Sequence, residues 1–433
     1  MSHLQNSDVA EVSGYPISNS LRFQSASSQY LSRTPASATN QTTWTWSAWV
    51  KRGSLGTLQQ LFGRAVGSGT ELQILFNGDV LSFYQTLSNA VQGIRTTTQV
   101  FRDPSAWYHI VCVWDTSNAT ALDRMKIYVN GVQVTAFATP TNPTLNLASY
   151  VNAVGVHSIG ADYVSAGNII YYLDGYLTEV NFIDGQALTP SSFGETNTLT
   201  GQWVAKKYTG TYGTNGFYLP FSNGTSTTTL GADSSGNSNN WTLNNFTRSA
   251  GVSDCWMYDV PSGNGSAGTQ PNSNYAVLNP LATTASNPTY SKANLTVSTP
   301  VANGGNAYGT IALPSSGKYY WEYIHTSGNA GDVMFGVSAY SPSQNYVWQN
   351  ANSLFYYGFD GNKWTNGSAT AYGATYTLND VIGIAVDIDA SAVTFYKNNV
   401  SQGSISFNAS GLFPAMSDAS GSAGAVLNIN FGQ

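Results

Sequence analysis

Hydrophobic and polar residues alternate along most of the chain with the period of a β-strand. Two segments place apolar side chains at every second position, which are Trp44, Trp46, Ala48 and Val50 in one and Ile382, Ile384, Val386 and Ile388 in the other. Side chains with this spacing share one face of an extended strand, which we expect to face a core. No stretch has a helical period long enough to predict a helix. The pattern therefore predicts an all-β protein.

Two short turns support this prediction. The segment Met125 to Val134 forms two strand patterns on either side of Asn130-Gly131, which is the strongest short hairpin signal. A second hairpin is predicted around Asn398-Asn399, between strand patterns at 393–397 and 400–404. Adjacent hairpins of this kind are typical of antiparallel sheets.

Changes in composition divide the chain into four parts. Residues 1–20 are short and polar, and we predict an arm that serves as a possible attachment segment. Strand patterns fill 21–221 and 306–433, whereas 222–305 is rich in Ser, Asn, Gly and Thr. This middle segment also carries scattered aromatic residues, so we expect an ordered connector rather than a free linker. The predicted fold is two antiparallel β-sandwich (jelly-roll) domains joined by that connector.

The charge content, the apolar pattern and the number of cysteines exclude several classes of protein. The chain has 16 basic and 22 acidic residues and a net charge of −6, so no basic stripe is available to bind nucleic acid. No apolar run approaches the ~18 residues of a membrane span, and we expect no membrane insertion. The N-terminus lacks a secretory signal pattern. Cys112 and Cys255 are too few for a disulfide framework.

The first domain carries motifs typical of one group of jelly rolls. In chain order they are Leu21-Arg22-Phe23, Tyr30-Leu31-Ser32-Arg33, Trp44 to Lys51, Trp107-Tyr108-His109-Ile110-Val111, Ile127-Tyr128-Val129-Asn130-Gly131 and Asp174-Gly175-Tyr176-Leu177-Thr178-Glu179-Val180. With these motifs the domain resembles a laminin-G-like, concanavalin-type jelly roll.

The second domain resembles a SPRY domain. Its motifs are Gly317-Lys318-Tyr319-Tyr320-Trp321-Glu322, Ile382-Gly383-Ile384-Ala385-Val386-Asp387, Phe395-Tyr396-Lys397-Asn398 and Leu412-Phe413-Pro414-Ala415. The two domains in this order, bridged by Leu230-Gly231-Ala232-Asp233-Ser234-Ser235-Gly236, are similar to structural proteins of tailed phages. Both folds host unrelated functions, so this functional inference is an analogy.

An enzymatic alternative comes from the first resemblance. Concanavalin-type folds include laminarinase-type glycoside hydrolases with a Glu-x-Asp-x-x-Glu motif, and Glu179, Asn181 and Asp184 have that spacing. The central acid is here an amide, however, and without a bulge positions i and i+5 of a strand point to opposite faces. Retaining hydrolysis needs two carboxyls about 5–5.5 Å apart. We therefore predict no catalytic residue and a structural role for Glu179.

Metal binding is the next possibility. Laminin-G-like jelly rolls often bind one Ca²⁺, so the resemblance implies that Asp115, Asp123 and Asp162 could supply ligands. No Asp-x-Asp-x-Asp-Gly loop is present and acidic residues are common in turns. We predict no metal or other cofactor and leave a single Ca²⁺ open. His109 lies in an apolar strand, which predicts a hydrogen-bonded buried group rather than a base.

Candidate ligand-binding residues lie in a polar, glycine-containing stretch of the second domain. They are Tyr346, Trp348, Tyr356, Tyr357 and Trp364. SPRY domains generally bind through loops at one end of the sandwich, and this stretch falls in the corresponding part. Tyr among Asn, Ser and Gly is also typical of adaptable binding loops. Alternatively, the rings pack against a neighbouring subunit or the connector. A large loss of stability on truncating Trp348 would move the predicted site to loops of the first domain.

These observations predict a non-enzymatic protein on the external surface of a virion. We expect a tail-fibre or tail-tip adhesin that binds host surface polysaccharide or receptor, made in the host cytoplasm without a signal peptide. Its other partners would be virion proteins, and we expect a homo-oligomer, with a trimer favoured. The alternatives are a capsid decoration or head-fibre protein and a polysaccharide depolymerase.

Overall fold

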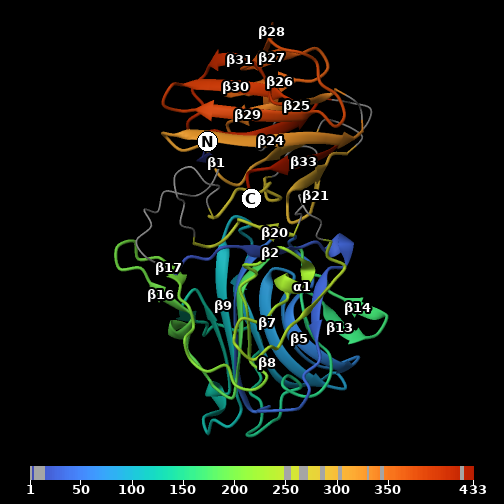
Figure 1. Cartoon of the computed structure of the whole chain (residues 1–433), viewed down its shortest axis with the longest axis vertical. Coiled ribbons are helices and arrows are strands. Elements are labelled where there is room, and N and C mark those ends of the chain that lie inside the picture. Colours follow the sequence, from blue (N-terminus) through green and yellow to red (C-terminus); the bar gives the residue numbers. More distant parts are fainter. Residues whose placement is uncertain are drawn as a thin grey trace. The chain divides into compact units, whose positions relative to one another are not determined.

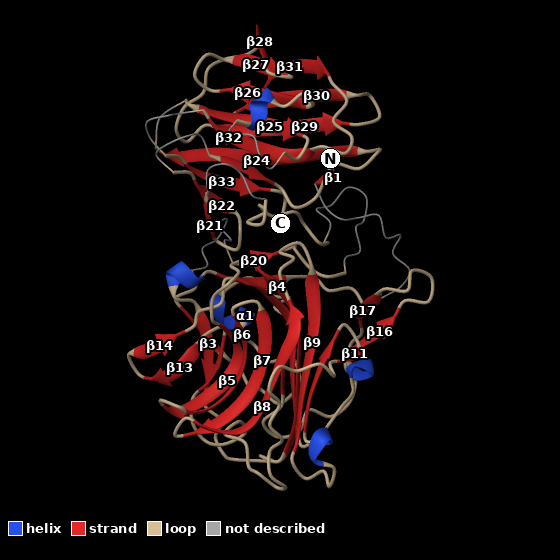
Figure 2. Ribbon diagram, turned by 180° about the vertical axis from the view of Figure 1, so that it is seen from behind, coloured by secondary structure: helices blue, strands red, loops and turns tan. Residues whose placement is uncertain are grey.

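The computed structural model describes residues 2–3, 15–247, 255–262, 272–282, 288–300, 305–328, 331–341, 346–419 and 424–433 (Figure 1). The chain divides into two compact units. The first unit is Val9–Asn264, and the second unit is Met1–Asp8 together with Gly265–Gln433. Strands, drawn red in Figure 2, dominate both units, which confirms the predicted all-β class.

Two large sheets form the first unit. The eight-stranded sheet has the order β11-β10-β9-β4-β15-β2-β20, with β18 also paired to β15. Its strands are β2 (Ser20–Phe23), β4 (Thr43–Arg52), β9 (Trp107–Asp115), β10 (Met125–Val129), β11 (Val132–Gln133), β15 (Gly175–Asp184), β18 (Phe217–Leu219) and β20 (Trp256–Met257). The seven-stranded sheet has the order β19-β3-β12-β5-β6-β7-β8. Its strands are β3 (Tyr30–Arg33), β5 (Gln59–Gly67), β6 (Thr70–Asn77), β7 (Val80–Leu87), β8 (Ala90–Val100), β12 (His157–Ile159) and β19 (Thr242–Asn244).

Short hairpins and short helical elements lie outside these two sheets. The hairpins are β13 (Asp162–Ser165) with β14 (Asn168–Ile170), and β16 (Gly194–Thr196) with β17 (Trp203–Ala205). The short helical elements of this unit are η1 (Ser25–Ser27), η2 (Ala121–Asp123), η3 (Pro190–Ser192) and α1 (Thr227–Leu230). Among the described residues, no helix has the length and apolar content that crossing a membrane requires.

The core of the first unit lies between its two sheets. The alternating side chains predicted to face inward, Trp44, Trp46, Ala48 and Val50, are all fully buried there. The predicted hairpin at Asn130-Gly131 joins β10 to β11, and both turn residues have positive φ, 47° and 81°. A two-residue turn with this backbone matches the twist of the strands that it connects.

The second unit also contains two sheets. One has the order β21-β22-β33-β24-β29-β30-β31, and its strands are β21 (Thr289–Ser291), β22 (Thr296–Ser298), β24 (Lys318–Ser327), β29 (Val381–Asp387), β30 (Ala392–Lys397), β31 (Val400–Ser406) and β33 (Val426–Asn430). The other has the order β23-β32-β25-β26-β27-β28, and its strands are β23 (Asn306–Tyr308), β25 (Val333–Ser338), β26 (Ser353–Tyr357), β27 (Asn362–Thr365), β28 (Ser368–Ala371) and β32 (Phe413–Asp418). The 3₁₀ turn η4 (Val347–Gln349) precedes β26.

Aromatic contacts join these two sheets face to face. Tyr323 of β24 stacks on Phe335 of β25 with ring centroids 4.5 Å apart, and Tyr356 of β26 lies 5.4 Å from Phe395 of β30. The predicted inward side chains of β29 are buried in the same space. The hairpin predicted at Asn398-Asn399 connects β30 to β31.

The observed division differs from the predicted domain boundaries at two places. Residues 222–305 are not a separate connector. Their first part extends the first unit, because β19 and β20 pair at its sheet edges and Trp241 enters its core. Their last part supplies β21 and β22 to the second unit. In the predicted arm at 1–20, β1 (Ser2–His3) pairs with β24 in parallel, and residues 4–14 lie outside the described part.

Candidate binding site

A polar pocket lies on the face of the seven-stranded sheet that points away from the core. Leu72 and Ile74 of β6 enter the core, so Glu71 and Leu75 face the other way. The hairpin of β13 and β14 contributes a second side. We call this cavity of about 310 Å³ the Glu71 pocket, and its lining residues are Leu58, Ser68, Gly69, Glu71, Leu75, Asn77, Tyr84, Asn89, Asp162, Val164, Asn168, Ile170 and Tyr171.

Two carboxylates of the Glu71 pocket are held by neighbouring side chains. The Tyr84 hydroxyl donates to Glu71 Oε1 at 2.9 Å. Gln73 Nε2 donates to Asp162 Oδ1 at 2.8 Å, and the Gln60 amide donates to Gln73 in turn. These contacts fix the orientation of both acids before any ligand arrives, which reduces the entropy that binding loses.

Burial perturbs one of these acids. Only 2% of Asp162 is exposed, and this burial raises the pKa of its carboxyl to about 6. The hydrogen bond from Gln73 acts in the opposite direction, and repulsion from the Glu71 charge adds to the rise in the pKa. Asp162 is therefore mostly ionised at neutral pH, but its charge is held in a poorly solvated position.

The backbone at Tyr171 is strained. This residue has a φ of 56°, in the left-handed region that bulky side chains rarely adopt. It directly follows β14, and its carbonyl accepts a hydrogen bond of 2.8 Å from the Gln60 backbone N–H. The conformation places Tyr171 in the lining of the Glu71 pocket. Strain of this kind costs of order 1–3 kcal/mol and occurs preferentially at ligand sites.

The three acids considered for Ca²⁺ do not come together. Asp115 accepts a hydrogen bond of 2.6 Å from the Ser117 hydroxyl, and Asp123 forms an ion pair of 3.0 Å with Lys126. Asp162 lies in the Glu71 pocket instead. No group of three or more His, Cys, Asp or Glu side chains within the described ranges could hold a metal ion. These residues therefore do not fit a Ca²⁺ site.

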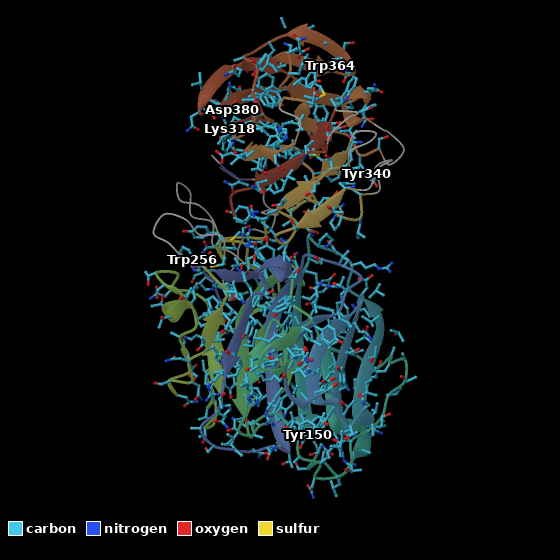
Figure 3. All side chains as sticks on the ribbon, turned by 90° about the vertical axis from the view of Figure 1, so that its right-hand side faces the viewer. Tyr150, Trp256, Lys318, Tyr340, Trp364 and Asp380 are labelled. Atoms are coloured by element: carbon cyan, nitrogen blue, oxygen red, sulfur yellow. The ribbon has the colours of Figure 1, made fainter. Side chains whose placement is uncertain are left out.

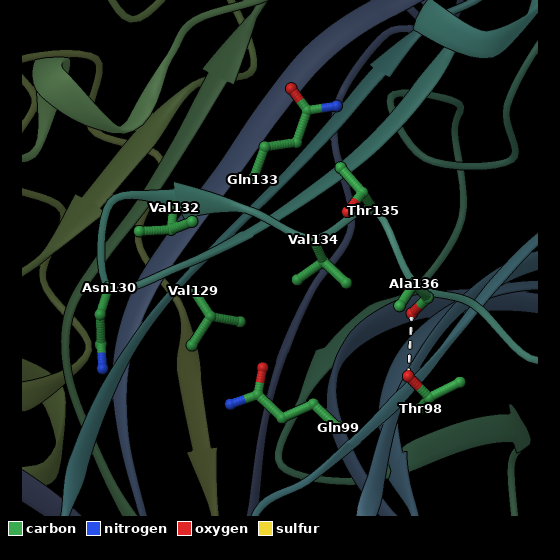
Figure 4. A pocket seen from close by; sticks show the side chains of 9 residues that line it. All are labelled: Thr98, Gln99, Val129, Asn130, Val132, Gln133, Val134, Thr135 and Ala136. Carbon is green, nitrogen blue, oxygen red and sulfur yellow. Dashed lines mark hydrogen bonds between the residues drawn. The ribbon is translucent and has the colours of Figure 1, made fainter.

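A second cavity of the first unit lies beside the β10–β11 hairpin (Figure 4). Its volume is about 360 Å³, and it is lined by Thr98, Gln99, Val129, Asn130, Val132, Gln133, Val134, Thr135 and Ala136. Thr98 Oγ1 donates to the Ala136 carbonyl at 3.5 Å, which is the dashed line in Figure 4. The lining contains neither a charged side chain nor an aromatic ring. It therefore offers less chemistry for orienting a ligand than the Glu71 pocket does.

The second unit brings four of its five predicted binding residues together. Tyr346, Trp348, Tyr357 and Trp364 form what we call the tryptophan cluster. The rings of Trp348 and Trp364 meet edge to face with centroids 4.5 Å apart, and Tyr346 lies 5.7 Å from Trp348. Trp364 is labelled in Figure 3.

The tryptophan cluster packs on the face of the six-stranded sheet opposite the inter-sheet core. Trp348, Tyr357 and Trp364 are partly buried against a set of fully or almost fully buried side chains, which includes Tyr308, Met334, Val347 and Phe355. The indole N–H groups of Trp348 and Trp364 are buried and have no hydrogen-bond partner within the described residues. The cluster is therefore mainly an apolar packing surface on its own sheet, and packing against a neighbouring subunit remains a prediction.

The fifth predicted residue, Tyr356, lies elsewhere. It is fully buried between the sheets, where its ring packs against Tyr376 and Phe395 and its hydroxyl donates to the Ala374 carbonyl. Neighbouring residues of a strand point to opposite faces, so Tyr356 cannot share a surface with Tyr357. The stretch predicted as loops contains β26 and β27, and its apolar run is buried on both faces.

The residues of the hydrolase-like motif do not form a carboxyl pair. A bulge between Thr178 and Asn181 gives Glu179 a φ of 51°, and the Tyr218 hydroxyl lies 2.8 Å from both Glu179 carboxylate oxygens. Burial raises the Glu179 pKa to about 7, and the Tyr218 hydrogen bond opposes that rise. Asp184 instead accepts hydrogen bonds from the Asn152 side chain at 2.9 Å and the Asn215 backbone at 3.0 Å. Neither acid lines the Glu71 pocket.

His109 is a satisfied buried group, as predicted. Trp203 Nε1 donates to its Nδ1 at 2.9 Å, so Nε2 carries the proton and donates to Ser47 Oγ, also at 2.9 Å. Burial lowers the pKa of His109 to about 3. The imidazole is therefore neutral, and both of its nitrogens are engaged in positioning Trp203 and Ser47.

Most of the Glu71 pocket is absent from the sequence-based predictions. Asp162 is named there only as a Ca²⁺ ligand, and Glu71, Tyr84 and Tyr171 are not named. One signal was available, because Glu71 and Leu75 alternate with the core residues of β6 and leave an acid on the outer face. The hairpin that encloses that face is almost a hundred residues away in the sequence.

Comparison with known proteins finds a matching domain family in each unit. Residues 25–192 match the concanavalin A-like lectin/glucanases superfamily, and residues 318–433 match the SPRY domain family. The chain is 33% identical over 131 residues to Ran-binding protein 9 of Danio rerio, which is 29% of this chain and 21% of that protein. The chain thus spans only about a fifth of the length of this relative.

Two solved structures are also similar to part of this chain. The SPRY domain of human HERC1 has 22% identity and a TM-score of 0.29, and the match covers 31% of this chain and 87% of that one. A heptameric SAP-like pentraxin from Limulus polyphemus has 17% identity and a TM-score of 0.32, covering 45% of this chain and 94% of that one. The two family matches show that the chain combines a laminin-G-like, concanavalin-type jelly roll with a SPRY domain.

Proposed function

We propose that this chain is a non-enzymatic recognition protein that binds polysaccharide through the Glu71 pocket of its jelly-roll unit. The pocket is the single observation that carries this proposal. It combines fixed carboxylates, exposed amides and two tyrosine side chains in one cavity. Convergent polar groups beside aromatic surface are what a sugar, with hydroxyls on its rim and apolar ring faces, requires.

The strained backbone at Tyr171 also supports this site. Its φ of 56° places the residue in the lining, and the surrounding hydrogen bonds maintain that conformation. A fold that only needed stability would gain from a less strained residue at this position. The proposal therefore assigns ligand binding, rather than packing, as the reason for a tyrosine there.

We place this binding protein on the outside of a tailed-phage virion, as a tail-fibre or tail-tip adhesin. The support is the similarity of the domain pair to phage structural proteins together with the low charge and the all-β architecture. In this setting its partners are other virion proteins and host surface polysaccharide or receptor. A homotrimer is the favoured assembly, and light scattering of the purified chain tests it by measuring the mass in solution.

The second candidate function is a capsid decoration or head-fibre protein. The tryptophan cluster favours it, because partly buried rings with little polar chemistry suit a permanent protein interface. A depolymerase, the third candidate, would need a carboxyl pair, and Glu179 and Asp184 belong to separate hydrogen-bond networks. Release of reducing sugar from host polysaccharide would identify that activity.

Binding of the purified chain to host cells and to their isolated polysaccharide tests the adhesin proposal. Tyr84→Phe removes the hydroxyl that holds Glu71 and should weaken polysaccharide binding by roughly tenfold, which corresponds to about 1.4 kcal/mol. Tyr150→Phe in the same unit removes a hydroxyl outside the pocket and should leave binding unchanged. Equal binding by both variants, or no binding by the wild-type chain, would exclude this pocket as the glycan site.

A further inference from the structure

The acids of the Glu71 pocket have no basic partner in its lining. Other carboxylates of the same unit do have such partners. Asp259 lies 2.7 Å from the buried ammonium of Lys51, and Asp79 lies 2.6 Å from Arg102. The lining of the pocket contains two carboxylates and no Lys, Arg or His side chain. The pocket therefore has a negative potential that no basic side chain of its lining compensates.

One oxygen of each carboxylate remains available to a ligand. Tyr84 and Gln73 occupy Glu71 Oε1 and Asp162 Oδ1. In the part of the chain that is described, no donor contacts Glu71 Oε2 or Asp162 Oδ2. Neither oxygen is among the buried side-chain atoms that lack a partner, so both are open to the pocket even though only 2% of Asp162 is exposed. A cationic donor is the group that would best satisfy both oxygens.

We propose that the Glu71 pocket binds a sugar unit with an unacetylated amino group, whose ammonium donates to Glu71 and Asp162. This inference rests on the proposed glycan-binding function and names its ligand class. Ser68, Asn77, Asn89 and Asn168 supply donors and acceptors for hydroxyl groups in the same lining. Uronic and sialic acids would place a third negative charge beside two fixed ones, so the pocket excludes them.

The size and polarity of the pocket favour a sugar over a basic peptide. A cavity of about 310 Å³ is at the lower end of the range for small-molecule sites, which suits one sugar ring. A lysine side chain would present its ammonium on a flexible apolar stem and would leave the amide groups of the lining without partners. An amino sugar satisfies the carboxylates and the amides together.

The proposal is tested with two sugar hexamers that differ only in acetylation. The probes are the hexamer of glucosamine and that of N-acetylglucosamine, titrated calorimetrically at about pH 6.5, above the pKa of about 6 at Asp162. We expect the glucosamine hexamer to bind at least tenfold more tightly, and added salt to reduce this preference. Glu71→Gln should abolish the preference, whereas Glu195→Gln, an exposed acid outside the pocket, should retain it.

Each of the other possible results of these titrations would contradict a different part of the inference. Equal or tighter binding of the acetylated hexamer would exclude the ammonium and leave glycan binding in place. A preference that persists in the Glu71→Gln, Asp162→Asn double variant would indicate adsorption elsewhere on this acidic protein. Competition by oligolysine as strong as that by the glucosamine hexamer would identify a peptide site. If neither hexamer nor any host polysaccharide binds, the proposed function fails as well.

Discussion

In the laminin-G-like unit, Lys51 and Asp259 form an ion pair with a distance of 2.7 Å, and both side chains are fully buried. In the SPRY unit, Lys318 and Asp387 form an ion pair with the same distance, but 66% of the Lys318 side chain is exposed. Lys318 is labelled in Figure 3. The first unit thus encloses charge in its interior and surrounds it with partners such as Trp107, whose indole N–H donates to Asp259 at 3.0 Å.

The candidate surfaces follow the same division. The Glu71 pocket presents carboxylates that Tyr84 and Gln73 orient, while the tryptophan cluster presents rings whose buried N–H groups have no partner among the described residues. Similar mixtures of aromatic and polar residues in the sequence therefore produce two different surfaces. Polar groups that hydrogen bonds keep in a fixed orientation can select a ligand by the direction of its hydrogen bonds. Packed aromatic rings can select a ligand only by its shape.

Breaking the buried ion pair should have the largest effect. Asp259→Ala removes the carboxylate 2.7 Å from the buried Lys51 ammonium, and we expect a loss of about 3–5 kcal/mol in the free energy of unfolding of the first unit. Asp387→Ala in the second unit is the matched control. It should lower the unfolding midpoint much less, because 66% of the Lys318 side chain is exposed and the other contact that it removes is one hydrogen bond from the Ala390 backbone N–H. Urea unfolding of both variants measures the difference, and similar losses would contradict the contrast between the units.

Glu179 provides a pH-dependent test of the first unit. Its pKa of about 7 lies above the ordinary value of 4.5, so the folded state retains a proton that the unfolded state has lost between these pH values. Stability from this group is fully present below pH 4.5 and is lost as the pH rises through 7, by up to roughly 3 kcal/mol. Tyr15, Tyr212, Tyr218 and Lys207 surround the carboxyl.

The Glu179→Gln variant isolates this contribution. Urea midpoints measured from about pH 4 to 8 should fall less steeply for Glu179→Gln than for the wild-type chain, because the amide does not titrate. Glu195→Gln, at an exposed site of the same unit, should reproduce the wild-type profile. Parallel profiles for the wild-type chain and Glu179→Gln would show that the pKa of Glu179 is the same in the folded and unfolded states.

Trp348 tests the packing interpretation of the second unit. Complete burial would predict a loss of about 3–5 kcal/mol on truncation, and Trp348 is only partly buried, so Trp348→Ala should cost roughly 2 kcal/mol. Phe359→Ala is the control, because Phe359 is 67% exposed and its loss should not affect unfolding. Calorimetric unfolding of the two variants provides the measurement. Unchanged stability of Trp348→Ala with weaker cell binding would instead restore the tryptophan cluster as the ligand site.

The sequence was sufficient for the strands and their inward faces. Trp44 to Val50 and Ile382 to Ile388 alternate with period two, and the side chains that face the core follow directly from that period. The other face of β4 is also buried, but polar side chains such as Thr45 and Ser47 keep the alternation visible in the sequence. The order Leu354-Phe355-Tyr356-Tyr357 is apolar without alternation, because both faces of β26 are covered. Periodicity cannot distinguish a strand covered on both faces from a loop rich in aromatic residues, so Tyr356 was placed on the wrong surface.

The sequence could not predict the Glu71 pocket, for a different reason. Its lining combines β6 and β7 with the hairpin that contains Asp162 and with Tyr171, which are distant in the chain. Alternation identifies Glu71 as a residue of the outer face, but not whether another element encloses that face. Likewise, the positive φ at Glu179 results from a bulge against β4, and a regular strand was the natural expectation from its sequence.

The smallest expected effect concerns Tyr171, where stability and binding should change in different directions. Asn tolerates a φ of 56° better than Tyr does, so Tyr171→Asn should leave stability unchanged or raise it by up to about 1 kcal/mol. Polysaccharide binding should fall by roughly tenfold, because the ring is lost from the Glu71 pocket. Thermal unfolding and binding titrations on the same preparation measure the two effects.

The neighbouring Tyr172 supplies the opposite control. Its φ is not positive, and its ring packs against Tyr30 with centroids 6.4 Å apart. Tyr172→Asn should therefore lose stability through the missing ring contact and keep its affinity for polysaccharide, since Tyr172 does not line the pocket. If Tyr171→Asn lost stability and Tyr172→Asn lost binding, the strained backbone would belong to the packing of the jelly roll. A ligand would then have to contact the other side of the β13–β14 hairpin.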